Sequence, residues 1–122
     1  MSVNPYQKFM QQSVSTMTPV QLIVALFEKG EQELKKSIYF IENKDIENAN
    51  NSLTKVQDIV LTLDGSLKMK YELSEQLSAL YQYFLQQLIE ANVNKDIEII
   101  KELIPFFTEL KESFAEISRK GY

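Results

Sequence analysis

The side chains best suited to chemistry in this chain lie in the pentapeptide NKDIE, which occurs twice, at Asn43–Glu47 and at Asn94–Glu98. Each copy brings one lysine and two carboxylates together, and enzymes use such side chains for proton transfer. The same residues also suit a turn between helices. Lysine favours the negative end of a finishing helix, and Asp and Glu favour the first turn of the next. We therefore interpret NKDIE as a helix-to-helix corner rather than a catalytic site.

Missing residue types narrow the chemistry further. The chain has no cysteine and no histidine. Disulfides, thiolate metal sites and a cysteine nucleophile are therefore excluded, and the commonest general base and metal ligand is absent. We expect no enzyme activity, no cofactor and no metal site.

Charge and hydropathy exclude two other classes. The formal charge is -4, Arg119 is the only arginine, and the cations are scattered among the acids, which disfavours nucleic-acid binding. No apolar run approaches the ~20 residues of a membrane span. The chain also opens with polar residues rather than a basic and then apolar signal sequence. We expect a cytoplasmic protein without membrane insertion.

The helices that could position these residues are predicted from the spacing of apolar side chains. Apolar residues recur every three or four positions, as in helices. Thr18, Pro19 and Gln21 form a capping-box pattern that predicts a helix start. Helices are predicted over about 18–42, 45–63, 72–92 and 96–118. The two NKDIE corners and their short connections predict an all-α, antiparallel up-down four-helix bundle over 18–119. Their repetition leaves a duplicated hairpin open as an origin.

Each predicted helix has an apolar face that we expect to point inward. Gly65 is expected to cap the second helix, and Pro105 is expected to bend the fourth. The inward residues are Leu22, Ile23, Leu26, Phe27, Gly30, Leu34, Ile38 and Ile41; Ile46, Ala49, Leu53, Val56, Ile59 or Val60, and Leu63; Leu73, Leu77, Leu80, Tyr81, Phe84, Leu88 and Ala91; Ile97, Ile100, Leu103 or Ile104, Phe107, Leu110, Phe114 and Ile117.

The chain carries more apolar residues than such a bundle needs. The extra residues are Tyr81, Leu85 and Ile89 in the third helix, Val60 and Leu61 in the second, and Ile99 and Phe106 in the fourth. They indicate either a wide core with ordinary exposed apolar residues or a groove that accepts an amphipathic helix from a partner.

The first seventeen residues form a separate segment. Tyr6, Phe9, Met10, Val14 and Met17 alternate there with polar residues. Residues 1–17 are predicted to be an N-terminal arm or short helix that caps the bundle, either as a fixed terminus or as a cover that a partner displaces. If the arm competes with a partner, removing residues 1–15 should strengthen or speed partner binding.

Two stretches of the sequence resemble the flagellar secretion chaperones (FliS). They read NPYQKFMQQSVSTMTPVQL from Asn4 and LYQYFLQQLIEANVNKD from Leu80. Leu53, Lys55, Gln57, Asp58 and Ile59 resemble the family's second helix, so the resemblance runs from Asn4 to about Phe114. It implies a four-helix chaperone that binds the C-terminal segment of flagellin in the cytoplasm and prevents its premature polymerisation. It also implies that the N-terminal arm covers an apolar pocket that the client takes over.

The first helix departs from the family pattern. The family carries Tyr-Asp-Gly or Tyr-Asn-Gly there, whereas this chain has Phe27-Glu28-Lys29-Gly30, which displaces the glycine by one position. Glu33 stands where an apolar residue is usual. The departure leaves open a divergent paralogue with another client as the alternative.

Partner-binding residues are predicted in the N-terminal arm, on the second and third helices, and at the second corner. They are Tyr6, Ile59, Val60, Tyr81, Leu85, Leu88, Ile89, Asn92 and Asp96. A core ring remains the alternative for Tyr81, and helix capping remains the alternative for Asn92 and Asp96. The expected partner is the flagellin C-terminal segment, and an adaptor or regulator that binds another flagellar export component is the alternative function. Monomer and dimer both remain open.

Overall fold

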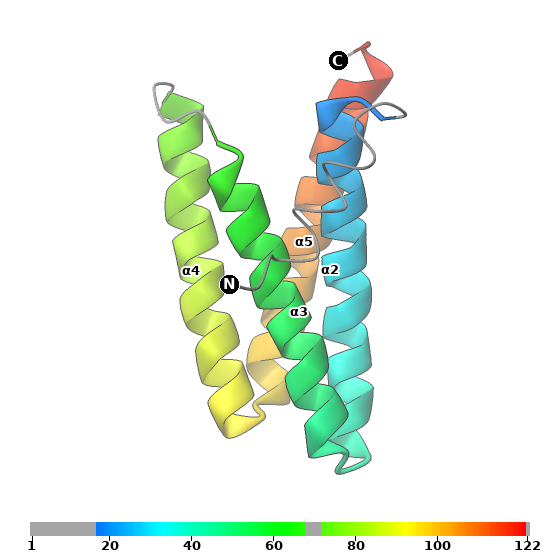
Figure 1. The fold of residues 1–122 in the computed structure, drawn as a ribbon, viewed down its shortest axis with the longest axis vertical. Helices are drawn as coiled ribbons and strands as arrows, with labels where there is room; N and C mark the ends of the chain where they lie inside the picture. Colours follow the sequence, from blue (N-terminus) through cyan, green and yellow to red (C-terminus); the bar gives the residue numbers. More distant parts are fainter. Residues whose placement is uncertain (1–16, 68–71, 122) are drawn as a thin grey trace, which may run out of the picture.

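The fold is an antiparallel bundle of α-helices, given by a computed structural model that describes residues 17–67 and 72–121 (Figure 1). Within this part of the chain the helices are α2 (Pro19–Glu42), α3 (Ile46–Gly65), α4 (Glu72–Asn94) and α5 (Ile97–Arg119). The predicted fold class is confirmed, and the predicted helix ends lie within one or two residues of the observed ones. The predicted arm, apart from Met17, lies outside the described residues.

A capping box starts α2, as the sequence predicts. The Gln21 backbone N–H donates to the Thr18 hydroxyl oxygen over 3.1 Å, and the Thr18 N–H donates to the Gln21 side-chain oxygen over 3.0 Å. Pro19 occupies the first helical position, where a backbone N–H has no intrahelical acceptor. Local sequence therefore determines where α2 begins.

Both NKDIE segments form corners with the same backbone conformation. Lys44 and Lys95 adopt left-handed φ values of 60° and 51°. The aspartate that follows each lysine ends one helix and caps the start of the next. Asp45 N–H donates to the Phe40 carbonyl over 2.8 Å, and Asp96 N–H donates to the Ala91 carbonyl over 3.0 Å. This is a helix C-terminal motif in which glycine usually takes the left-handed position. The predicted corner is confirmed, with lysine at the position that glycine commonly occupies.

The core is centred on α2, which packs extensively on both α3 and α5. Phe27 of α2 makes an edge contact with Phe107 of α5, with ring centroids 5.8 Å apart, and lies 6.3 Å from Tyr81 of α4. Gly30 lies directly against the Phe107 ring. Aromatic side chains from α2, α4 and α5 therefore join in one interior cluster.

Several apolar residues expected in the core are exposed at helix ends. Ile46 is in the first turn of α3, Leu73 in the first turn of α4 and Ile117 in the last turn of α5, and they are 48%, 63% and 40% exposed. The inward prediction is wrong for these three residues. A terminal turn extends past the neighbouring helices, so the helical period continues without a surface to pack against.

The end of α3 differs from expectation. Gly65 is the last residue of α3 rather than its cap, and Ser66 caps the helix in a right-handed conformation. The prediction of a glycine cap is therefore wrong, because the chain does not need a positive φ at this point. Pro105 lies inside α5, which continues as one helix through it.

Candidate functional site

Helix α4, the third of the bundle, is the least tightly packed. It contacts α3 moderately and α5 least of all the neighbouring pairs. In Figure 1 the α3 and α4 pair diverges from α2 and α5 toward the end where α4 begins. This helix therefore has more side-chain surface available to a partner than α2 has.

One exposed face runs along α3 and α4. The alignment of α4 along α3 is fixed by Asp64 of α3, which accepts hydrogen bonds from Ser78 over 2.8 Å and from Gln82 over 3.2 Å. Leu85 and Ile89 lie seven residues, about two helical turns, beyond Ser78 and Gln82 and therefore on the same side of α4.

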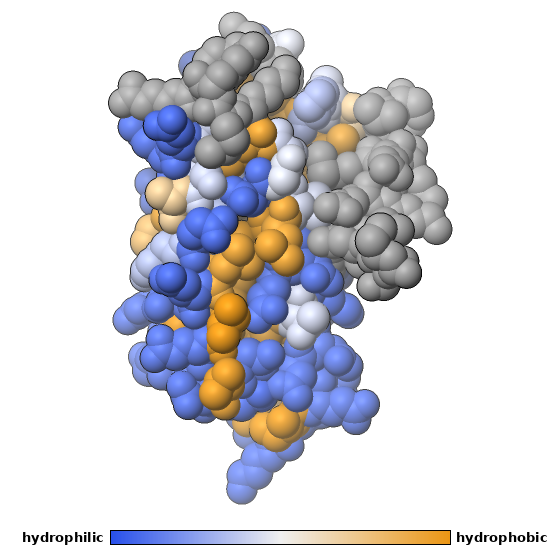
Figure 2. Space-filling model, turned by 60° about the vertical axis from the view of Figure 1, so that its left-hand side comes forward, coloured by the Kyte–Doolittle hydropathy of each residue, from blue (hydrophilic) through white to orange (hydrophobic). Residues whose placement is uncertain are grey.

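We call this surface the α3/α4 face, made by Leu61, Leu85, Ile89 and Val93. Leu61, Ile89 and Val93 are 50%, 55% and 77% exposed, and Leu85 is half-buried against the core. Figure 2, which turns the α4 side of the molecule forward, shows hydrophobic side chains gathered in a stripe along the long axis. A row of this kind is typical of a surface that binds an amphipathic segment.

Four of the predicted binding residues are instead in the core of the free protein. Ile59, Val60, Tyr81 and Leu88 are at most 1% exposed. Burial raises the pKa of the Tyr81 hydroxyl, and the nearby charge of Asp64 adds to this effect. These residues hold α3 and α4 together in this conformation and offer no surface to a partner.

The predicted residues at the second corner make capping contacts. Asp96 is the N-cap of α5 and accepts from the Glu98 backbone N–H over 3.0 Å. The Asn92 side-chain oxygen accepts from the Lys95 ammonium over 2.9 Å. Both residues therefore have structural partners within the corner. Tyr6 lies outside the described residues.

Sequence reasoning missed an aromatic contact at the junction of α4 and α5. Tyr83 and Phe106 are 40% and 38% exposed, and their ring centroids lie 6.1 Å apart in an edge contact. Phe106 also packs on the buried Phe84 at 5.6 Å. Tyr83 was missed because its helical position falls outside the apolar stripe of α4. What identifies Tyr83 is its position opposite Phe106, and only the packing of α4 against α5 reveals this position.

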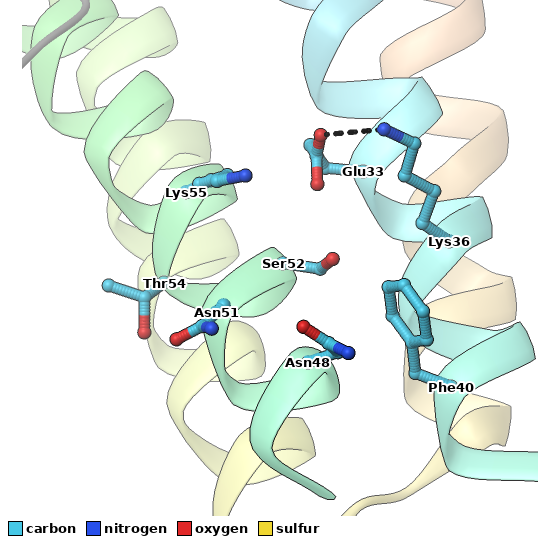
Figure 3. A pocket seen from close by; sticks show the side chains of 8 residues that line it. All are labelled: Glu33, Lys36, Phe40, Asn48, Asn51, Ser52, Thr54 and Lys55. Carbon is cyan, nitrogen blue, oxygen red and sulfur yellow. Dashed lines mark hydrogen bonds and ion pairs between the residues drawn. The ribbon is translucent and has the colours of Figure 1, made fainter. Parts of the chain in front are cut away.

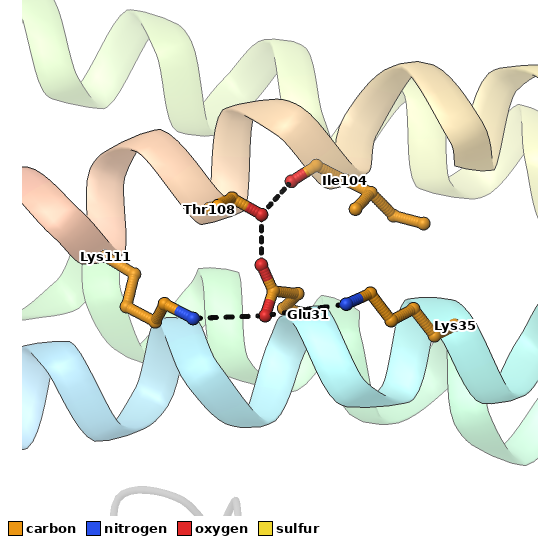
Figure 4. Close-up of polar contacts among 5 residues, drawn as sticks. All are labelled: Glu31, Lys35, Ile104, Thr108 and Lys111. Carbon is orange, nitrogen blue, oxygen red and sulfur yellow. Dashed lines mark hydrogen bonds and ion pairs between the residues drawn. The ribbon is translucent and has the colours of Figure 1, made fainter.

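A buried carboxylate links α2 to α5 on the opposite side of the bundle (Figure 4). Glu31 is 8% exposed, and its carboxylate accepts from the Thr108 hydroxyl and from the Lys111 ammonium over 3.2 Å. The hydrogen bond from Thr108, with the charges of Lys111 and Lys35, outweighs desolvation and lowers the pKa of Glu31. This cluster ties α2 to α5.

The described residues contain no group of three or more acidic side chains placed to hold a metal ion. None of α2 to α5 has an apolar stretch that could span a bilayer, within the part of the chain that the structure describes.

The fold and its exposed face define a small all-α protein with spare apolar surface of the kind used in protein contacts. A sequence model of the family described as Flagellar protein FliS matches residues 2–121. The chain therefore belongs to the FliS family.

Individual relatives have the same family name. The flagellar secretion chaperone FliS of Bacillus subtilis is 31% identical over 113 residues, which cover 93% of this chain and 85% of the relative. That of Salmonella typhimurium is 28% identical over 121 residues, covering 94% and 87%. That of Escherichia coli is 24% identical over 109 residues, covering 87% and 80%.

Proposed function

We propose that this protein is a cytoplasmic export chaperone that binds the C-terminal helical segment of flagellin and keeps it monomeric until export. Family membership supports the chaperone role, since the relatives are named flagellar secretion chaperones. The α3/α4 face is the observation that carries the proposed binding mode. The role requires binding and release of a polypeptide and no chemical catalysis.

The driving force is burial of apolar surface. Ile89 is 55% exposed, so covering it completely would contribute about 1 kcal/mol, roughly half the value for burying a whole isoleucine side chain. A client helix covering Leu61, Ile89 and Val93 together would gain a few times this amount. The client loses conformational entropy when it orders, so tight binding needs a longer contact than these residues alone provide.

Leu85 and Ile89 are the central contacts of the proposal, and Val93 extends their row. Ile59, Val60, Tyr81 and Leu88 would support the face from beneath, because they fix α4 against α3. A direct role for these four in client binding would require α4 to move. Direct roles for Tyr6, Asn92 and Asp96 stay predictions.

Co-purification with flagellin tests the function. The protein should retain full-length flagellin and lose flagellin that lacks its C-terminal tail. Equal retention of both proteins would contradict tail binding and favour an adaptor for another part of the export system.

The double variant Ile89→Glu/Val93→Glu tests the face. Both side chains are more than half exposed, so helix content and the melting temperature should stay nearly unchanged while flagellin binding falls at least about tenfold, which corresponds to ~1.4 kcal/mol. Tyr39→Glu is the matched control, because Tyr39 is an equally exposed apolar residue on α2. Wild-type affinity in the double variant would remove the α3/α4 face from the proposal.

A further inference from the structure

A second surface lies between α2 and α3, on a different side of α3 from the α3/α4 face. It is a groove of about 370 Å³. Figure 3 shows its two walls, with Lys36 and Phe40 on α2 and Lys55 and Asn51 on α3. The lining residues are Glu33, Lys36, Phe40, Asn48, Asn51, Ser52, Thr54 and Lys55. Unlike the α3/α4 face, this groove is lined mainly by polar and charged groups.

A buried carboxylate forms the floor of the groove. Glu33 has a side chain only 1% exposed, and it lies 3.0 Å from the Lys29 ammonium and 3.5 Å from that of Lys36. Desolvation would raise the pKa of Glu33, but hydrogen bonds from Lys29 and Ser52 and the lysine charges outweigh it and lower the pKa. Glu33 is therefore ionised at neutral pH, and it forms ion pairs with both Lys29 and Lys36.

The groove has cations in excess of this one carboxylate. The side chain of Lys36 is 55% exposed even while it contacts Glu33. Lys55 is exposed on the opposite wall and points toward Glu33 in Figure 3, and it makes no ion pair with the described residues. Lys29, Lys36 and Lys55 thus surround a single acid, in a chain whose formal charge is -4. The local excess of positive charge runs against the charge of the whole protein.

We propose that this groove binds an acidic stretch of the client polypeptide, with an Asp or Glu side chain seated between Lys36 and Lys55. The proposal rests on the function proposed above. Charge complementarity selects the occupant, since an acidic segment is repelled by most of this protein and attracted here. Asn51 is an exposed amide that can donate to the same carboxylate, and the Phe40 ring provides an apolar edge for the client chain. The client would then contact two sides of α3, one apolar and one charged.

Charge reversal tests this site in the full-length protein. Flagellin binding is measured by titration at about 50 mM and about 300 mM NaCl, since screening weakens exposed ion pairs. Lys36→Glu/Lys55→Glu should weaken binding about three- to thirty-fold at low salt, as expected for two partly exposed ion pairs. The loss should shrink at high salt. Lys101→Glu/Lys120→Glu is the matched control, because it makes the same charge change on and beside α5.

A second variant that removes the lysine charges without adding negative charge controls for misfolding next to Glu33. Lys36→Gln/Lys55→Gln adds no negative charge beside the buried carboxylate and should show a smaller loss in the same direction. The second arm uses the C-terminal segment of flagellin with its Asp and Glu residues changed to Asn and Gln. This segment should bind the wild type and the lysine variants equally.

Three outcomes separate the two proposals. If wild-type protein fails to bind flagellin at all, the proposed function is overturned. If wild type binds and the lysine variants match the Lys101/Lys120 control, only the groove is overturned. The groove proposal also fails if the lysine variants lose as much affinity for the neutralised segment as for the native one, because the loss would then not depend on client carboxylates.

Discussion

At Gly30 the backbone of α2 packs directly against the Phe107 ring of α5. A Cβ atom at this position would lie 2.6 and 2.8 Å from two carbons of the Phe107 ring. The ring has little room to move, because it also contacts Phe27 and lies 5.2 Å from Phe84. The glycine that the family pattern places one position earlier is thus an interior contact in this chain, where only hydrogen fits.

Gly30→Ala should therefore destabilise the protein. Overpacking of this kind costs about 1–3 kcal/mol, and the better helix propensity of alanine recovers about 0.5–1 kcal/mol of it. The measurement is the free energy of unfolding in urea. Gly65→Ala is the control, since within the described part of the chain no atom outside its sequence neighbours and its own helix backbone lies within 4 Å of the added Cβ, and it should be neutral or slightly stabilising. If Gly30→Ala and Gly65→Ala gave the same stability, Phe107 would not be the constraint.

Helix α4 is held in the core by its buried side chains but packs only weakly against α5. Tyr81, Phe84 and Leu88 are buried in the common core, yet α4 makes few contacts with α5 and exposes Ile89 and Val93 beside α3. In contrast, α2 is held on both sides, by α3 and by the Glu31 cluster on α5. A helix with few neighbours opens at a lower free-energy cost than one enclosed by them.

Hydrogen exchange should reveal this difference between helices. Amides in the middle of α4 are expected to exchange about tenfold or more faster than those in the middle of α2, a difference in opening free energy of ~1.4 kcal/mol. Bound flagellin should slow exchange in α4 more than in α2. Mass spectrometry of peptides from the full-length protein measures both. Equal protection of the two helices in the free protein would contradict the looser packing of α4.

At the scale of the whole molecule, two buried carboxylates link pH to stability. Glu31 joins α2 to α5, and Glu33 lies at the floor of the groove between α2 and α3. The pKa of each is lowered from its ordinary value of 4.5 in the folded state. A lowered pKa stabilises the folded state fully above the unfolded value, and this stabilisation is lost as pH falls through the folded value.

Acid should therefore destabilise the protein partly through these two groups. Stability in urea is expected to hold between neutral pH and about pH 5 and to fall below the ordinary glutamate pKa. Glu31→Gln should be less stable than wild type at neutral pH and should lose less on acidification. Thr108→Val, which removes the hydrogen bond to Glu31, should shift the profile in the same direction. If Glu31→Gln lost as much stability on acidification as wild type, Glu31 would be excluded as a cause of the destabilisation in acid.

Local features of the sequence determined the helices and their corners. The Thr18–Gln21 capping box and the Asp45 and Asp96 caps need only residues two to three positions away, so a linear pattern contains all the required information. The period of apolar residues likewise identified most of the core, because a helix turns at a fixed angle per residue. Fold class and helix ends therefore follow from the chain by itself.

Tertiary packing decided which apolar rows are covered. Tyr81 and Ile89 were both assigned to one extra row of α4, yet Tyr81 is 1% exposed and Ile89 is 55% exposed. The helical period gives a direction but no distance to the neighbouring helix, and the separation of α4 from α3 and α5 sets which directions are filled. The pairing of Tyr83 with Phe106 and of Glu33 with Ser52 depends in the same way on which helices meet, and at what height.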